Sequence, residues 1–120
     1  MDLLDVFKDS HDLVTFSSGS VIIAEGNEEN HMYVVMQGEV TIALKDRVIA
    51  TAVAGEIVGE MALIDSDIRS ATVTARTDCV LAFIDQASFM SLLRHVPEFK
   101  LHVMNLLATR LHNTYDMMER

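Results

Sequence analysis

The spacing of hydrophobic and polar positions divides the chain into a short helical opening, a long strand region and a helical end. Leu3–Lys8 is a short amphipathic segment, which predicts a helix. After it come short apolar runs separated by turn residues, and several runs alternate with a period of two. These runs predict strands at Leu13–Phe16, Val21–Ala24, Met32–Met36, Glu39–Leu44, Val48–Val53, Ala71–Ala75 and Val80–Ile84.

The alternation within these strands indicates an antiparallel roll or sandwich in which one face of each strand is buried. Val40, Ile42 and Leu44 share one face of their strand, and smaller or polar residues occupy the other. Glycines fall between or at the edges of the runs, where tight turns or positive φ angles are expected. They are Gly19, Gly26, Gly38 and Gly55.

From Gln86 the apolar period becomes helical. Phe89, Leu92 and Leu93 line one face of a short helix that must end before Pro97. Proline suits the first turn of a new helix, and Glu98 beside it complements the helix dipole. The sequence therefore predicts one long helix from about Pro97 to Met118.

This long helix has two apolar stripes. Phe99, Val103 and Leu106 predict that its first turns pack against the roll. The second stripe has the three-and-four spacing of a two-stranded coiled coil and predicts a homodimer through this helix. Its members are Met104, Leu107, Leu111, Thr114 and Met118. The alternative is that this stripe packs on the chain's own roll.

Composition narrows the class of protein. The 120 residues and 50% hydrophobic content fit one globular domain over residues 1–120, with the roll at about 12–85 and the C-terminal helices at about 86–118. The net charge of −9 argues against binding nucleic acid, although one small anion is still compatible with it. Cys79 is the single cysteine, so no internal disulfide is expected. With no spanning segment or signal peptide expected, we predict a cytoplasmic protein without membrane contact.

One segment interrupts the strand pattern and carries the candidate chemistry. Gly55–Ala75 behaves as neither strand nor plain loop, and its Glu60–Ile64 part favours a single helical turn after Gly59. The free N–H groups at the start of such a turn attract anions. Arg69, followed by Ser70, offers a guanidinium and a hydroxyl for a phosphate. The sequence therefore predicts a site for a sugar phosphate.

The stretch from Gly59-Glu60-Met61-Ala62-Leu63 through Arg69-Ser70-Ala71 resembles the phosphate-binding cassette of cyclic nucleotide-binding domains. Residues Tyr33–Val40 resemble the roll turns of the same family, and the effector domain of the catabolite activator protein group is the closest likeness. The resemblance implies a mainly β fold: a jelly-roll-like double-stranded β-helix with a short N-terminal helix, a one-turn cassette helix and a long C-terminal helix. Ile68 is a departure, because many members have proline before the arginine.

The resemblance also implies roles for individual residues. Glu60 would accept a hydrogen bond from the ribose 2′-hydroxyl, Arg69 would pair with the cyclic phosphate, and Ser70 would donate to it. Backbone contacts would come from Gly59, Met61 and Ala62, and Ala71 would close the cassette. Thr114 on the long helix would meet the purine.

We therefore expect a stand-alone, non-catalytic sensor of cyclic AMP or cyclic GMP that needs no cofactor. The family's transcription factors continue into a DNA-binding domain, which this sequence does not include, so DNA regulation by this chain alone is not expected. The alternative is a protein-interaction scaffold that has the same fold and binds no ligand. An enzyme is not expected, since the five histidines show no metal-ligand spacing and no nucleophile motif is present.

Overall fold

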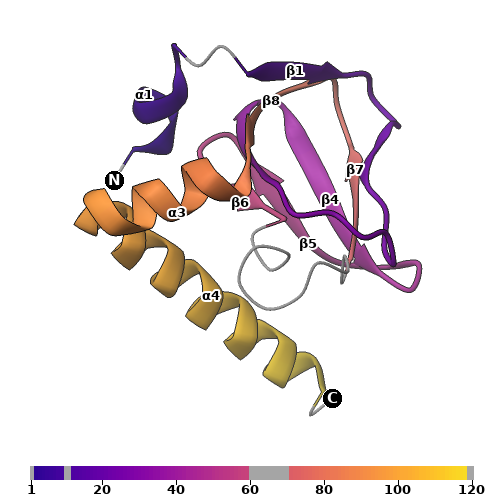
Figure 1. Ribbon diagram of the computed structural model, residues 1–120. Coiled ribbons are helices and arrows are strands. Elements are labelled where there is room, and N and C mark those ends of the chain that lie inside the picture. Colours follow the sequence, from indigo (N-terminus) through magenta and orange to yellow (C-terminus); the bar gives the residue numbers. More distant parts are fainter. Residues whose placement is uncertain (1, 10–11, 60–70, 119–120) are drawn as a thin grey trace. The chain divides into compact units, whose positions relative to one another are not determined.

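The computed structural model describes residues 2–9, 12–59 and 71–118, with side chains through Thr109. The chain divides into two compact units, Asp2–Gln86 and a helical unit from Ala87 onward. The first unit contains α1 (Leu3–Phe7) and the strands (Figure 1). The second contains nearly all of α3 (Gln86–His95) and the whole of α4 (Pro97–Met118).

The strands of the first unit form two antiparallel sheets, as the mainly β prediction requires. One sheet has the order β1 (Leu13–Phe16), β8 (Cys79–Ile84), β3 (Met32–Gln37), β6 (Ile57–Val58). The other has the order β2 (Val21–Ile23), β7 (Thr72–Ala75), β4 (Glu39–Leu44), β5 (Arg47–Val53). Each predicted strand is confirmed, with ends that differ by at most one residue.

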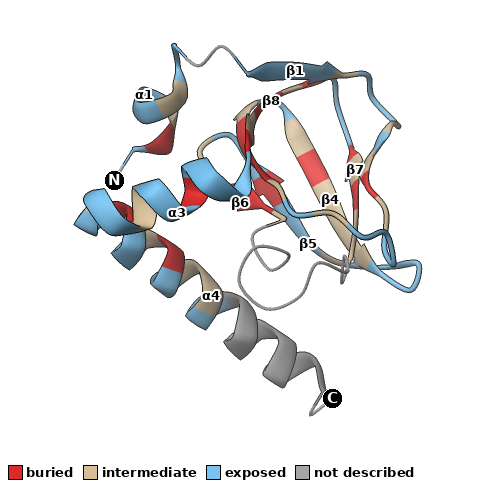
Figure 2. Cartoon of the chain, in the orientation of Figure 1, coloured by how far each residue is buried: buried red, intermediate tan, exposed pale blue. Residues whose placement is uncertain are grey.

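The core lies between the inner faces of the two sheets. Val35 of β3 is paired with Leu81 of β8, and both side chains are fully buried. From the other sheet, Val40 of β4 and Val73 of β7 join the same core. Figure 2 shows buried residues on β6, β7, β8 and the middle of β4.

Two details of the strand prediction are wrong. No strand was expected between Val53 and Ala71, yet β6 pairs with β3 and its residues Ile57 and Val58 are buried. A two-residue strand that is buried on both sides has no alternation to detect. Leu44 is 42% exposed, although Val40 on the same predicted face is fully buried. Leu44 lies after an irregularity in the β4–β5 register, next to the hairpin turn.

The turn prediction for the glycines is confirmed. All four predicted turn glycines have φ between 88° and 96°, a region that other residues adopt reluctantly. The β4–β5 hairpin instead turns at Lys45 and Asp46, which both have positive φ. Consecutive residues with positive φ match the right-handed twist of a two-residue hairpin.

The helical unit confirms both predicted helices, with α3 ending before Pro97 and α4 running from Pro97 to Met118. The rings of Phe89 and Phe99 meet edge to face, with their centroids 5.8 Å apart, and both are fully buried. Val103 is also buried. Among the helices that the structure describes, none combines the length and apolar character needed to cross a membrane.

Candidate functional site

Along the sequence, the predicted cassette connects a strand of one sheet to a strand of the other. It follows β6 in one sheet and precedes β7 in the other. Of the predicted ligand-binding residues, Gly59 and Ala71 are described with their side-chain environment, and Thr114 is described as backbone within α4. The others lie outside the described residues, namely Glu60, Met61, Ala62, Arg69 and Ser70.

The start of the cassette is anchored by the turn between β5 and β6. The amide of Val53 donates to Oε1 of Glu56 at 2.9 Å, and the Glu56 amide donates back to the Val53 carbonyl at 3.0 Å. Val35 closes the same turn, because its carbonyl accepts from Gly55 at 2.8 Å and its amide donates to the Glu56 carbonyl at 2.9 Å. These reciprocal hydrogen bonds fix the position of β6.

Gly59 follows β6 with a φ of +83° and is half-buried. A residue with a Cβ would lose roughly 1–2 kcal/mol in this left-handed conformation. The backbone therefore turns at the residue where the predicted cassette begins. The sequence analysis placed Gly59 among the ligand contacts, and that role stays a prediction.

The end of the cassette is anchored by the loop after β2. The amide of Glu25 donates to Oγ1 of Thr72 at 3.1 Å, and Oε1 of Glu25 accepts from the Lys45 amide at 3.0 Å. Thr72 is the first residue of β7, and Ala71 before it is half-buried. Glu25 thus ties the residue after the cassette to the β4–β5 hairpin.

Sequence reasoning missed both anchors. Glu56 and Glu25 each occupy a turn, where a carboxylate is an ordinary solvent-facing residue. The partner of Glu56, Val53, is set by how the turn folds. The partner of Glu25, Thr72, lies 47 residues away in the sequence. The available signals were the adjacent glycines, Gly26 after Glu25 and Gly55 before Glu56. A glycine indicates a turn but does not predict which hydrogen bonds the glutamate forms.

Positive charge is sparse in the sequence around the cassette. Arg69 is the only basic residue in the sequence between Arg47 and Arg76. Arg76 already forms an ion pair with Glu39, with Nη1 and Oε1 2.9 Å apart, at the turn between β7 and β8. Arg47 is exposed on β5.

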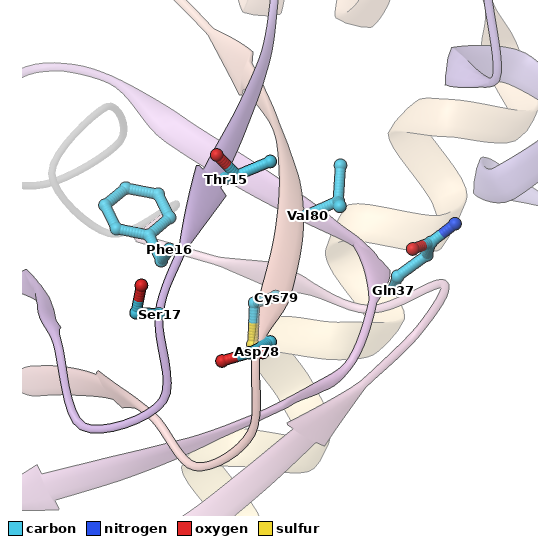
Figure 3. A pocket seen from close by; sticks show the side chains of 7 residues that line it. All are labelled: Thr15, Phe16, Ser17, Gln37, Asp78, Cys79 and Val80. Atoms are coloured by element: carbon cyan, nitrogen blue, oxygen red, sulfur yellow. The ribbon is translucent and has the colours of Figure 1, made fainter.

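A cavity of about 260 Å³ lies along β1 and β8, and Figure 3 shows the side chains around it. The described residues that line it are Thr15, Phe16, Ser17, Gln37, Asp78, Cys79 and Val80. They include one carboxylate and no basic group, so this lining does not suit a phosphate. The thiol of Cys79, one of the lining residues, lies within hydrogen-bond distance of two carbonyls, that of Thr77 at 3.1 Å and that of Glu39 at 3.3 Å.

The described part of the chain holds no group of three or more His, Cys, Asp and Glu side chains arranged for a metal ion.

The sequence and the fold both identify the family. The sequence model of the cyclic nucleotide-binding domain matches residues 13–96. This match covers most of the chain, so the chain belongs to the cyclic nucleotide-binding domain family. The solved catabolite activator protein of Thermus thermophilus superposes with a TM-score of 0.80 and 27% identity, over 89% of this chain and 53% of that one.

Two further proteins are similar to the chain. The c-di-GMP responsive global regulator CLP of Xanthomonas campestris superposes with a TM-score of 0.83 and 27% identity, over 99% of this chain and 62% of that one. A cAMP-dependent protein kinase regulatory subunit of Schizosaccharomyces pombe is 35% identical over 86 residues, or 71% of this chain. This chain spans only 21% of that relative's length. The similarity to this relative is therefore confined to a cyclic nucleotide-binding domain.

Proposed function

We propose that this domain binds cyclic AMP or cyclic GMP in the cassette from Gly59 to Ala71, without turning it over. Membership of the family and the two anchored ends of this segment support the proposal. The observation that carries it is Gly59, whose positive φ turns the chain directly after β6, at the residue where the family-like motif begins. A cytoplasmic location stays a prediction.

In the proposed complex, Arg69 pairs with the cyclic phosphate and Ser70 donates a hydrogen bond to it. The backbone N–H groups of Gly59, Met61 and Ala62 add further donors. Because Arg69 is the only basic residue in this stretch of sequence, its guanidinium offsets most of the phosphate's charge. Removing it should cost about 2–5 kcal/mol of binding free energy, or roughly 30-fold or more in Kd.

Glu60 is proposed to accept a hydrogen bond from the ribose 2′-hydroxyl. A comparison of ligands tests this contact. Glu60→Gln should weaken cyclic AMP binding but leave 2′-deoxy cyclic AMP binding nearly unchanged, because the deoxy ligand has no hydroxyl to lose. If Glu60→Gln weakens both ligands equally, Glu60 does not contact that hydroxyl.

We propose that the signal leaves the domain through α4, by a homodimer contact along the stripe from Met104 to Met118, with Thr114 meeting the purine. The exposure of Met104, 57% in the single chain, supports a partner for this stripe. A ligand that touches both the cassette and Thr114 would favour one dimer arrangement. The size of that effect is limited by its differential affinity for the two arrangements.

Calorimetric titration of the parent chain tests the proposed function directly. We expect a saturable heat with cyclic AMP or cyclic GMP, and the ligand with the lower Kd identifies the purine. Cyclic di-GMP should be titrated in parallel, because one structural neighbour is described as responsive to it. No heat with any of the three would contradict the proposal and favour a protein-interaction scaffold with the same fold.

A further inference from the structure

Three rings pack together at one end of the inner face of the β1–β8–β3–β6 sheet. The ring centroids of His31 and Phe83 are 4.7 Å apart with the planes tilted by 33°. Tyr33 meets both rings edge to face, with centroids 5.1 Å from His31 and 5.9 Å from Phe83. Tyr33 is buried, whereas His31 and Phe83 are half-buried. We call these three residues the aromatic cluster.

The strand pairing places the aromatic cluster beside the start of the cassette. Tyr33 is directly opposite Phe83 on one side and Val58 on the other. Val58 is the last residue of β6 and immediately precedes Gly59. Directly opposed residues have their Cβ atoms about 4.5–5.5 Å apart, so side chains at Tyr33 and Val58 touch or nearly touch.

β6 depends on its neighbour strand for its position. It is two residues long, and in the described part of the chain β3 is the strand that pairs with it. Edge-to-face aromatic contacts constrain orientation more than aliphatic packing does. The aromatic cluster therefore limits how far Tyr33, the partner of Val58, can shift, and with it the point from which Gly59 turns.

We propose that the aromatic cluster is a positioning element of the nucleotide site, which holds the start of the cassette in its binding geometry. This inference rests on the proposed function, since it concerns the affinity of the same site. His31, Tyr33 and Phe83 act through β6 and need not touch the ligand. Truncating the half-buried rings should weaken nucleotide binding more than the accompanying loss of stability explains.

Phe16 of β1 provides a matched comparison. Its ring also meets Tyr33 edge to face, at 6.1 Å, and it packs half-buried against the same core as Phe83. Phe16 is paired with Cys79, however, four residues along β8 from Phe83 and so roughly 13 Å away along the strand. Both rings touch Tyr33, but Phe83 is directly opposite Tyr33 in the strand pairing and also contacts His31, so Phe16→Leu should disturb the start of the cassette less than Phe83→Leu.

The experiment compares Kd for cyclic AMP and cyclic GMP, together with Tm, in the parent, Phe83→Leu, His31→Gln and Phe16→Leu chains. We expect Phe83→Leu and His31→Gln to raise Kd by roughly 3- to 30-fold, the range of positional coupling, while Phe16→Leu raises Kd less at a similar Tm. Equal increases in Kd for Phe83→Leu and Phe16→Leu, or none in either, would overturn the inference.

A spectroscopic readout follows the cluster itself. The rings of His31 and Phe83 are in contact, with centroids 4.7 Å apart. The NMR shifts of the His31 ring protons, assigned by their loss in His31→Gln, should therefore move when the nucleotide saturates the parent chain. Unmoved shifts at saturation would contradict the inference. If the parent binds and Arg69→Ala does not, but Phe83→Leu binds like the parent, the inference fails and the proposed function stands. If the parent binds no nucleotide, both fail.

Discussion

A side chain at position 38 would occupy space that the neighbouring turn already fills. Gly38 has a φ of +90°, and a Cβ there would meet the carbonyl oxygen of Asp78, with Sγ of Cys79 at 2.8 Å and Oγ1 of Thr77 at 3.0 Å. The same turn is held by the Glu39 carbonyl, which accepts from the Arg76 amide at 2.9 Å. Glycine is required here both by the backbone angle and by the space.

Gly38→Ala should therefore destabilise the roll more than Gly26→Ala. Gly26 has nearly the same φ, +88°, but a Cβ there would meet nothing within 4 Å. Both variants should lose about 1–2 kcal/mol from the left-handed backbone. Gly38→Ala should lose about 1–3 kcal/mol more from overpacking. Urea unfolding measures both values, and equal losses would show that the contacts at Gly38 do not matter.

At the scale of elements, amphipathic patterns predicted the strands and helices well because each is a repeated signal. The ends of α4 were predicted from Pro97 and from the length of its apolar stripes. The strands were predicted from their alternation of apolar and polar residues. β6 was missed because Ile57 and Val58 are too few to alternate. The hydrogen bonds of Glu56 and Glu25 could not be predicted, since they depend on how turns meet in the folded roll.

The candidate site likewise has one part that the sequence predicted and one part that it did not. The motif from Gly59 to Ala71 was recognisable because its residue types are specific at fixed spacing. The aromatic cluster was not, because His31, Tyr33 and Phe83 come together only through the register of β3 and β8. The folded chain thus adds the residues that support the proposed site, whereas the proposed ligand contacts of Glu60 and Arg69 rest on the sequence.

The predicted dimer stripe on α4 is tested by placing a charge on it. Leu107→Glu should give a monomer, because a buried carboxylate at a coiled-coil seam is unpaired and costly. Asn105→Glu adds the same charge at an exposed position of α4 outside the stripe and should leave the dimer intact. Gel filtration with light scattering measures the mass. A parent chain that is already a monomer at high micromolar concentration would contradict the dimer.

For the molecule as a whole, the net negative charge of the chain disfavours binding of an anionic ligand. The chain carries a net charge of −9, and its proposed ligand is an anion. Overall electrostatics therefore oppose binding, and a local arrangement of one guanidinium with backbone N–H groups has to overcome that repulsion. Such a site is sensitive to the loss of a single positive group, whereas charges elsewhere on the surface should matter little.

The most direct test of this account is a calorimetric titration of the preferred cyclic nucleotide into the parent, Arg69→Ala and Arg47→Ala chains. Arg47 is the control, because it is an exposed arginine outside the cassette. The account predicts that Arg69→Ala raises Kd by roughly 30-fold or more, whereas Arg47→Ala binds like the parent. Parent-like binding by Arg69→Ala would contradict it.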